Sequence, residues 1–165
     1  MEMEMEMNKM NKTPKDEVIS DIAKVIKYDD YSWHINDSFP SDLSEEAALT
    51  HMGMFIGWVI DKGFESEFLK EDCSNELYKF RERNITGAQF IKECCDYKLI
   101  SDDLNEEANR FAEKYYESGQ YYDDYANACN DNNETIFHES DNWENYEKIK
   151  NIIENRYKEW KKINY

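Results

Sequence analysis

Three histidines are the side chains in this sequence best suited to metal or acid–base chemistry. They are His34, His51 and His138, and they lie far apart along the 165 residues. Imidazole binds transition metals and titrates near neutral pH, so the three would form a site only if the fold brought them together. No His-Glu-x-x-His or His-x-x-x-His spacing is present, and a buried histidine hydrogen-bonded to a backbone group or a carboxylate is the commoner case. We therefore predict no metal and no cofactor, and keep a metal-dependent or acid–base enzyme that uses His34, His51 and Glu46 as an alternative.

The other reactive side chains form no catalytic pattern. The four cysteines contain no Cys-x-x-Cys pair, and we predict that they pack as small apolar residues in a reducing, cytoplasmic compartment. Adjacent carboxylates such as Asp102 and Asp103 become catalytic only in an apolar environment, and in so acidic a chain they are more often solvated. Neither a phosphate-binding glycine loop nor a nucleophile elbow is present. We therefore predict no catalytic residues.

Tyrosine and acid are combined most densely between Tyr115 and Tyr125. Adjacent residues on a helix point about 100° apart, so we expect some of these rings to be exposed. Exposed tyrosine supplies contact area at low entropic cost, and carboxylates beside it would meet Lys or Arg on a partner. The alternative is an aromatic core with a solvated acidic back. We predict two groups of partner contacts: Tyr116, Glu117, Tyr121, Asp123 and Asp124, and then Asp29, Asp30 and Trp33.

The formal net charge of −17 comes from 37 acidic and 20 basic residues. Such a charge repels nucleic acid and anionic membrane, so we predict a basic protein partner, no nucleic-acid partner and no membrane partner. The charge is uneven: residues 101–147 hold fourteen acids against two bases, whereas residues 148–165 hold six bases against two acids. The last helix could therefore lie against the acidic part of its own chain, which would explain some of the acidity without a partner.

Few turn-forming residues, five Gly and two Pro, favour a mainly α fold. The segment Met52–Ile60 carries no charge, yet it is too short to cross a bilayer, so we predict a buried central helix with other helices around it. Gly53 and Gly57 lie four residues apart and would let a neighbouring helix approach closely.

We predict a disordered low-complexity tail over residues 1–12 and a single helical domain over residues 13–165. A helix should begin at Thr13 and end near Lys27, and one short extended segment is expected near Trp33. Residues 86–89 read as a capping box, and apolar residues at helical spacing define a last helix from Trp143.

Several stretches together resemble a known family. They are Tyr28-Asp-Asp-x-Ser-Trp-His34, Phe39-Pro-x-Asp-Leu43, Glu46-Ala-Ala-x-Thr-His-x-Gly-Met-Phe55, Tyr122-x-Asp-Tyr125 and Trp143-Glu-Asn-Tyr146. The chain resembles an uncharacterised family of small acidic bacterial proteins, and the resemblance runs over nearly the whole expected domain. It implies a cytoplasmic protein of the kind suspected to neutralise toxins.

The sequence therefore leads to a hypothesis with two alternatives. The hypothesis is a non-enzymatic, acidic protein-binding module, an immunity-type inhibitor of a basic bacterial toxin. One alternative is the metal-dependent or acid–base enzyme described above. The other is a nucleic-acid mimic whose carboxylates are spaced like phosphates.

Overall fold

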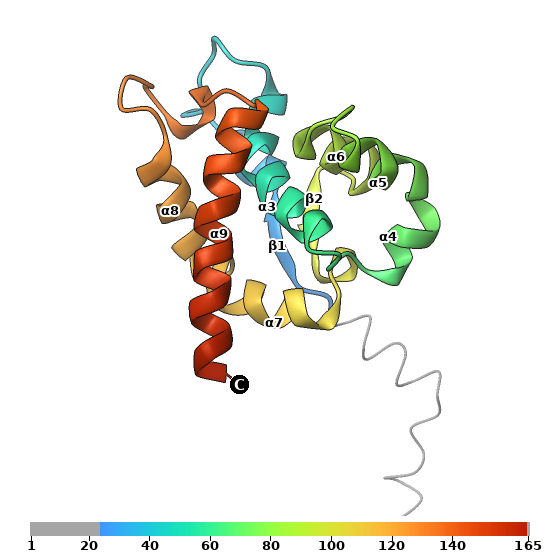
Figure 1. Ribbon diagram of the computed structural model, residues 1–165. Helices are drawn as coiled ribbons and strands as arrows, with labels where there is room; N and C mark the ends of the chain where they lie inside the picture. The colour runs from blue at the N-terminus through green and yellow to red at the C-terminus, as the bar shows by residue number, and fades with distance from the viewer. Residues whose placement is uncertain (1–23, 165) are drawn as a thin grey trace, which may run out of the picture.

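A computed structural model describes residues 24–164 of the chain (Figure 1). The elements are β1 (Lys27–Asp30), η1 (Tyr31–Trp33), η2 (Glu45–Leu49), α3 (Thr50–Asp61), α4 (Glu67–Asp72), α5 (Ser74–Arg81), α6 (Gly87–Cys94), β2 (Lys98–Ile100), η3 (Ser101–Asp103), α7 (Glu106–Tyr115), α8 (Gln120–Ala128), η4 (Ile136–His138) and α9 (Trp143–Asn164). The prediction of a mainly α domain is confirmed. The predicted tail, and nearly all of the helix predicted from Thr13, lie outside the described residues, and Lys27 begins a strand rather than ending a helix.

Helix α3 is the centre of the domain, as predicted, because every residue from Thr50 to Ile60 is buried. Helices α4, α5 and α6 lie on one side of it, and α8 and α9 lie on the other (Figure 1). Both glycines of α3 are contact points. A Cβ at Gly53 would lie only 2.1 Å from the backbone nitrogen of Ala88 in α6, and one at Gly57 would lie 2.7 Å from the ring of Tyr146 in α9. The predicted close approach is therefore confirmed at Gly53, where the backbone of α6 lies against α3, whereas Gly57 makes room for the rings of Tyr146 and Phe80.

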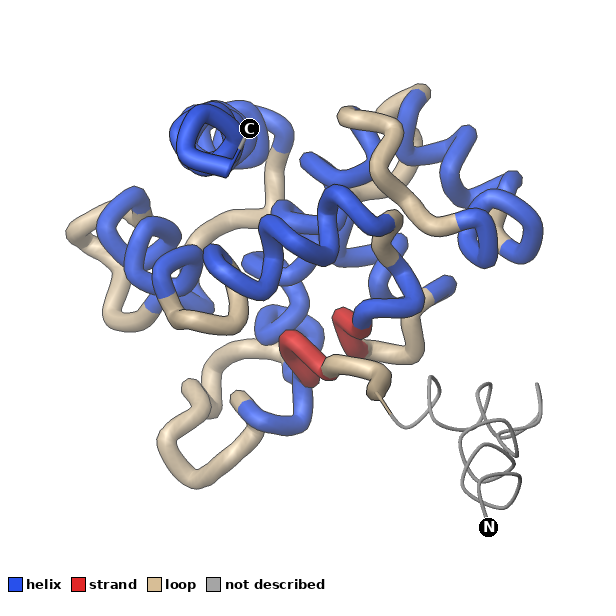
Figure 2. Tube along the Cα trace, turned by 90° about the horizontal axis from the view of Figure 1, so that it is seen from below, coloured by secondary structure: helices blue, strands red, loops and turns tan. Residues whose placement is uncertain are grey.

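The one sheet found in residues 24–164 has two antiparallel strands, β1 and β2 (Figure 2). Its extended segment lies slightly before the predicted place, because Trp33 itself belongs to the 3-10 turn η1. Asp29 pairs with Leu99, and the register is irregular between Lys27 and Asp29. Asp29 and Asp30 are both buried, so the strand carries two carboxylates into the interior.

The helix ends follow local sequence chemistry. The capping box predicted at residues 86–89 is present, with Thr86 accepting from the backbone of Gln89 and the Gln89 side chain accepting from the backbone of Thr86. Gly119 separates α7 from α8 with φ of 90°, a left-handed conformation in which a side chain would be strained. The corner between α7 and α8 places the tyrosine-rich stretch beside α3.

The basic last helix packs on the acidic part of the chain, as the charge distribution indicated. Arg156 contacts Asp124 through Nε at 2.9 Å, and Lys161 pairs with Glu107. Lys150 also reaches Asp61, which lies outside that part, at 3.1 Å. Part of the negative charge is therefore neutralised within the domain. None of the helices within residues 24–164 combines the length and the apolar composition that a membrane span requires.

Candidate metal centre

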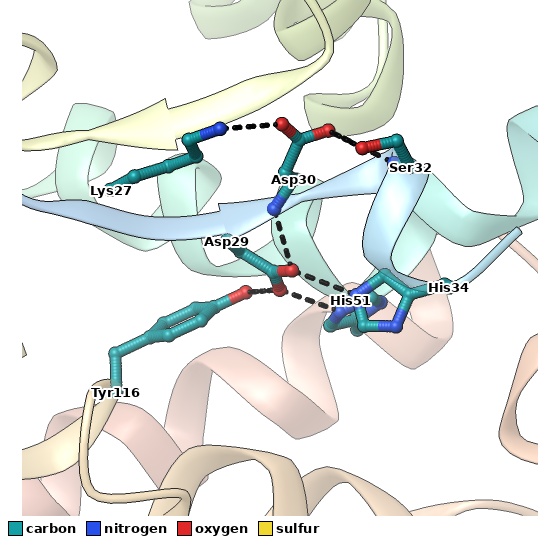
Figure 3. Close-up of polar contacts among 7 residues, drawn as sticks. All are labelled: Lys27, Asp29, Asp30, Ser32, His34, His51 and Tyr116. Atoms are coloured by element: carbon teal, nitrogen blue, oxygen red, sulfur yellow. Dashed lines mark hydrogen bonds and ion pairs between the residues drawn. The ribbon is translucent and has the colours of Figure 1, made fainter.

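Asp29 is the hub of a buried polar cluster (Figure 3). Its carboxylate accepts hydrogen bonds from His34 Nε2 at 2.7 Å, from His51 Nε2 at 2.9 Å, from the hydroxyl of Tyr116, and from the backbone N–H of Asp30 at 2.8 Å. The residue is only 4% exposed. Burial alone would raise the pKa of Asp29, but the hydrogen bonds from both histidines and Tyr116 hold it well below its ordinary value. The site therefore holds a carboxylate anion.

Local turn chemistry brings His34 back to Asp29. Asp30 is the N-cap of η1, and its side chain accepts from the backbone and the hydroxyl of Ser32 at 2.9 and 2.7 Å. Lys27 fixes the other oxygen of Asp30 at 2.9 Å. The turn that follows reverses the chain, so that the imidazole of His34 lies over the carboxylate five residues earlier (Figure 3).

His51 comes from the first turn of α3, far away in sequence. Its ring meets that of His34 edge to face at 4.8 Å between centroids. Phe137 of η4 covers both imidazoles, with centroid distances of 5.6 Å to His34 and 6.3 Å to His51. The side chains of His51 and Asp29 are 2% and 6% exposed, whereas that of His34 is 16% exposed. A small molecule would therefore reach the cluster on the side of His34.

The three side chains could hold a metal ion. One ligand atom from each of Asp29, His34 and His51 lies within 4.8 Å of the other two. Two imidazoles and a carboxylate form a recurrent ligand set for transition metals, and three protein ligands leave coordination positions open. Ligands bound tetrahedrally at about 2.1 Å lie about 3.4 Å apart, farther than the oxygen–nitrogen distances of 2.7 and 2.9 Å seen here. A cation that replaced the two N–H protons would therefore require the imidazoles to turn away from the carboxylate oxygens.

Tyr116 and the backbone of Asp30 would orient the carboxylate in such a centre. Both donate to its oxygens, and partners of this kind fix the direction of a metal-binding carboxylate. The Tyr116 ring is itself held between Phe55, at 5.0 Å, and Tyr121, at 5.0 Å. The position of the carboxylate is therefore determined by the packed core.

Glu46 of the enzyme alternative and the third histidine, His138, lie elsewhere. Glu46 is exposed and pairs with Lys92 at 2.5 Å. His138 contacts Asp42 through Nε2 at 3.1 Å and the hydroxyl of Thr135 at 2.9 Å. Both line a surface cavity of about 580 Å³ that also includes Phe137. The alternative sites, in which Glu46 or His138 joins His34 and His51, are not formed in this structure, because Phe137 lines the cavity and packs on both imidazoles.

The predicted docking surface is mostly interior. Tyr116 and Tyr121 are 8% and 1% exposed, so the expectation that these rings face outward is wrong. Rings that point in different directions are all buried here, because the corner between α7 and α8 is packed on two sides, by α3 and by α9. The hydroxyl of Tyr121 donates to the backbone carbonyl of His51 at 2.5 Å. This contact ties the tyrosine stretch to the candidate site.

The predicted acidic contacts are divided in the same way. Asp29 and Asp30 are buried, and Asp124 binds Tyr115 at 2.6 Å and Arg156 at 2.9 Å, so the expected exposure is wrong for these three as well. Each carboxylate is held by donors within its own domain. The predicted contacts that do face outward are Trp33, Glu117 and Asp123. Asp29 is thus the site residue whose role the sequence reasoning missed, and His34 five residues later was the available clue.

These features define a class: a small helical domain with a buried imidazole–carboxylate cluster where a two-stranded sheet meets its central helix. Residues 27–139 match the family described as a domain of unknown function, DUF7832, and the chain belongs to that family. The matched range contains all four side chains of the Asp29 cluster and ends before α9. No curated protein and no solved structure matches the chain. The resemblance to an uncharacterised family is confirmed at this level.

Proposed function

We propose that this protein is a metal-dependent enzyme whose Asp29, His34 and His51 bind one divalent transition-metal ion. The observation that carries the proposal is that the turn after β1 and the start of α3 bring one ligand atom from each of these residues within 4.8 Å of the other two. A metal held by three protein ligands keeps positions for water and substrate. Such a metal can lower the pKa of bound water and polarise a carbonyl or phosphoryl oxygen.

The surroundings of the cluster favour this role over a purely structural one. A buried polar network that only stabilised the core would be best served by complete exclusion of water, yet the His34 side chain is 16% exposed. Tyr116 and Asp30 already hold the carboxylate in place. Ligands that are oriented in advance are what a catalytic metal needs.

Metal analysis of the purified protein and titration of the metal-free protein with Zn²⁺, Mn²⁺ and Fe²⁺ test the proposal. We expect one equivalent at this site and at least about a hundredfold loss of affinity in His34→Gln, since a direct ligand matters more than an orienting partner. Tyr116→Phe keeps the three ligands and removes one orienting hydrogen bond, so its affinity should fall about tenfold.

His138→Gln is the matched control. His34 and His138 have the same side-chain exposure of 16%, and each contacts a carboxylate through Nε2. His138 lies outside the cluster, so its substitution should leave metal affinity unchanged. Wild-type protein that binds no metal, or equal losses in the two histidine variants, would overturn the proposal.

The toxin-inhibitor hypothesis stays a prediction with less support. Its surface was to consist of eight residues, of which five are buried or paired within the domain. Trp33 is 53% exposed and lies beside Lys27, whose Nζ is 5.5 Å from the ring. A pull-down at low salt that recovers a basic protein from the wild type, but not from Trp33→Ala, would restore that hypothesis.

A further inference from the structure

A second group of metal-binding side chains lies where α4, α5 and α6 meet. Cys73 is the residue between α4 and α5, Glu76 lies in the first turn of α5, and Cys94 is the last residue of α6. One ligand atom from each lies within 4.8 Å of the others. The two sulfur atoms are among these ligand atoms, so they lie within 4.8 Å of each other. None of these residues belongs to the Asp29 cluster.

The donor set identifies the kind of ion. Two cysteine sulfurs and one carboxylate oxygen suit Zn²⁺, which prefers thiolate ligands in a tetrahedral arrangement. Asp72 lies beside Cys73 and Glu93 beside Cys94, and their negative charges act on these thiols together with that of Glu76. A negative environment favours a divalent cation.

We propose that Cys73, Glu76 and Cys94 form a zinc site that fastens the α4–α5 junction to the end of α6. Binding replaces the two thiol protons, which pass to solvent, and water completes the tetrahedral coordination. Cys73 is buried, and Cys94 and Glu76 are half-buried, so the ion would lie just below the surface. In this arrangement the carboxylate of Glu76 is a zinc ligand, whereas a disulfide between the two cysteines would not involve it.

Cobalt titration tests the site, because bound Co²⁺ gives a thiolate charge-transfer absorption that histidine and carboxylate ligands do not give. We expect this band in the wild-type protein kept reduced by a phosphine. The band should disappear in Cys94→Ser and persist in Cys129→Ser, the matched control, since Cys129 is equally half-buried but lies elsewhere. It should also persist in His34→Gln, so that failure of this site and of the Asp29 site can be told apart.

Glu76→Gln keeps both thiols and changes a half-buried side chain that the fold can tolerate. We expect it to retain the charge-transfer band and to bind Zn²⁺ at least about tenfold more weakly. Circular dichroism of each variant separates lost binding from lost structure. Absence of the band in folded wild-type protein would overturn the proposal. So would an equal zinc content in wild type and Cys94→Ser, or a Cys73–Cys94 disulfide formed with glutathione disulfide in a protein without zinc affinity.

Discussion

Asp103 allows the effect of burial on a carboxyl group to be tested directly. Its side chain is buried, and no basic side chain within residues 24–164 forms a salt bridge with it. It is 3% exposed and accepts a hydrogen bond from the backbone of Ile100 at 3.1 Å. Burial, with a smaller contribution from the charge of Asp102, raises the pKa of Asp103 from 3.8 to about 7. The hydrogen bonds from Ile100 and Cys95 act in the opposite direction but do not outweigh burial.

The sign of the effect follows from proton binding. Between about pH 4 and pH 7 the folded protein keeps the proton on Asp103, whereas the unfolded chain has lost it. The free energy of unfolding therefore falls as pH rises through this window, and the loss is complete above the folded pKa. At about 1.4 kcal/mol per pKa unit, the full loss is roughly 4 kcal/mol, of which about 2–3 kcal/mol falls between pH 5 and pH 8.

Asp103→Asn removes the titration and keeps an oxygen that can accept from Ile100. When the pH is raised from about 5 to 8, the stability of the variant relative to the wild type should therefore increase by about 2–3 kcal/mol. Urea titrations followed by tryptophan fluorescence measure this difference. Taking the variant minus the wild type cancels the other titrating groups.

Asp102→Asn is the control, since Asp102 is exposed and adjacent. Its stability should stay within about 0.5 kcal/mol of the wild type at both pH values. If the Asp103→Asn difference is the same at the two pH values, the burial argument for this carboxyl group is refuted.

Two further pairs of variants test the packing. Gly53→Ala should destabilise the domain by at least about 3 kcal/mol, because its Cβ would collide with the backbone of α6. Gly63→Ala, with φ of 73° and open space around it, should cost only about 1 kcal/mol, and equal costs in calorimetry would contradict the close approach. Tyr121→Phe should lose about 1 kcal/mol with its buried hydrogen bond. Tyr125→Phe should be neutral or slightly stabilising, because its buried hydroxyl meets no partner among the described residues, and the reverse order in urea titrations would contradict this reasoning.

The parts of the fold that depend on residues close together in the sequence could be predicted. The capping box at Thr86 indicates a helix start, and Gly119 indicates a helix break. The uncharged run of α3 indicates a buried helix. The two glycines of α3 predicted close helix packing without naming the neighbours. Which helices approach there depends on tertiary contacts, and no local pattern contains that information.

The candidate site could not be predicted because it depends on one long-range pairing. Asp29 is buried only when β1 pairs with β2, about seventy residues later, and when α3 places His51 against the same carboxylate. In a chain with 37 acidic residues, composition alone makes each carboxylate look solvated. The one local indication was the short spacing between Asp29 and His34, which lie on either side of a turn capped by Asp30.

The coincidence of tyrosine and acid in this sequence has a physical explanation inside the fold. A core rich in tyrosine must provide acceptors for buried hydroxyl groups, because an unpaired buried hydroxyl is costly, and carboxylates from other elements provide them. The pairs are Tyr116 with Asp29, Tyr115 with Asp124, Tyr146 with Asp61, and Tyr157 with Glu107. Three of these four carboxylates also contact a basic side chain, so their negative charges are paired within the domain. Asp29 is the exception, because two imidazoles take the place of the Lys or Arg. Since imidazole, unlike ammonium or guanidinium, readily exchanges a ring proton for a metal ion, this is the tyrosine–acid pair to which we assign chemistry.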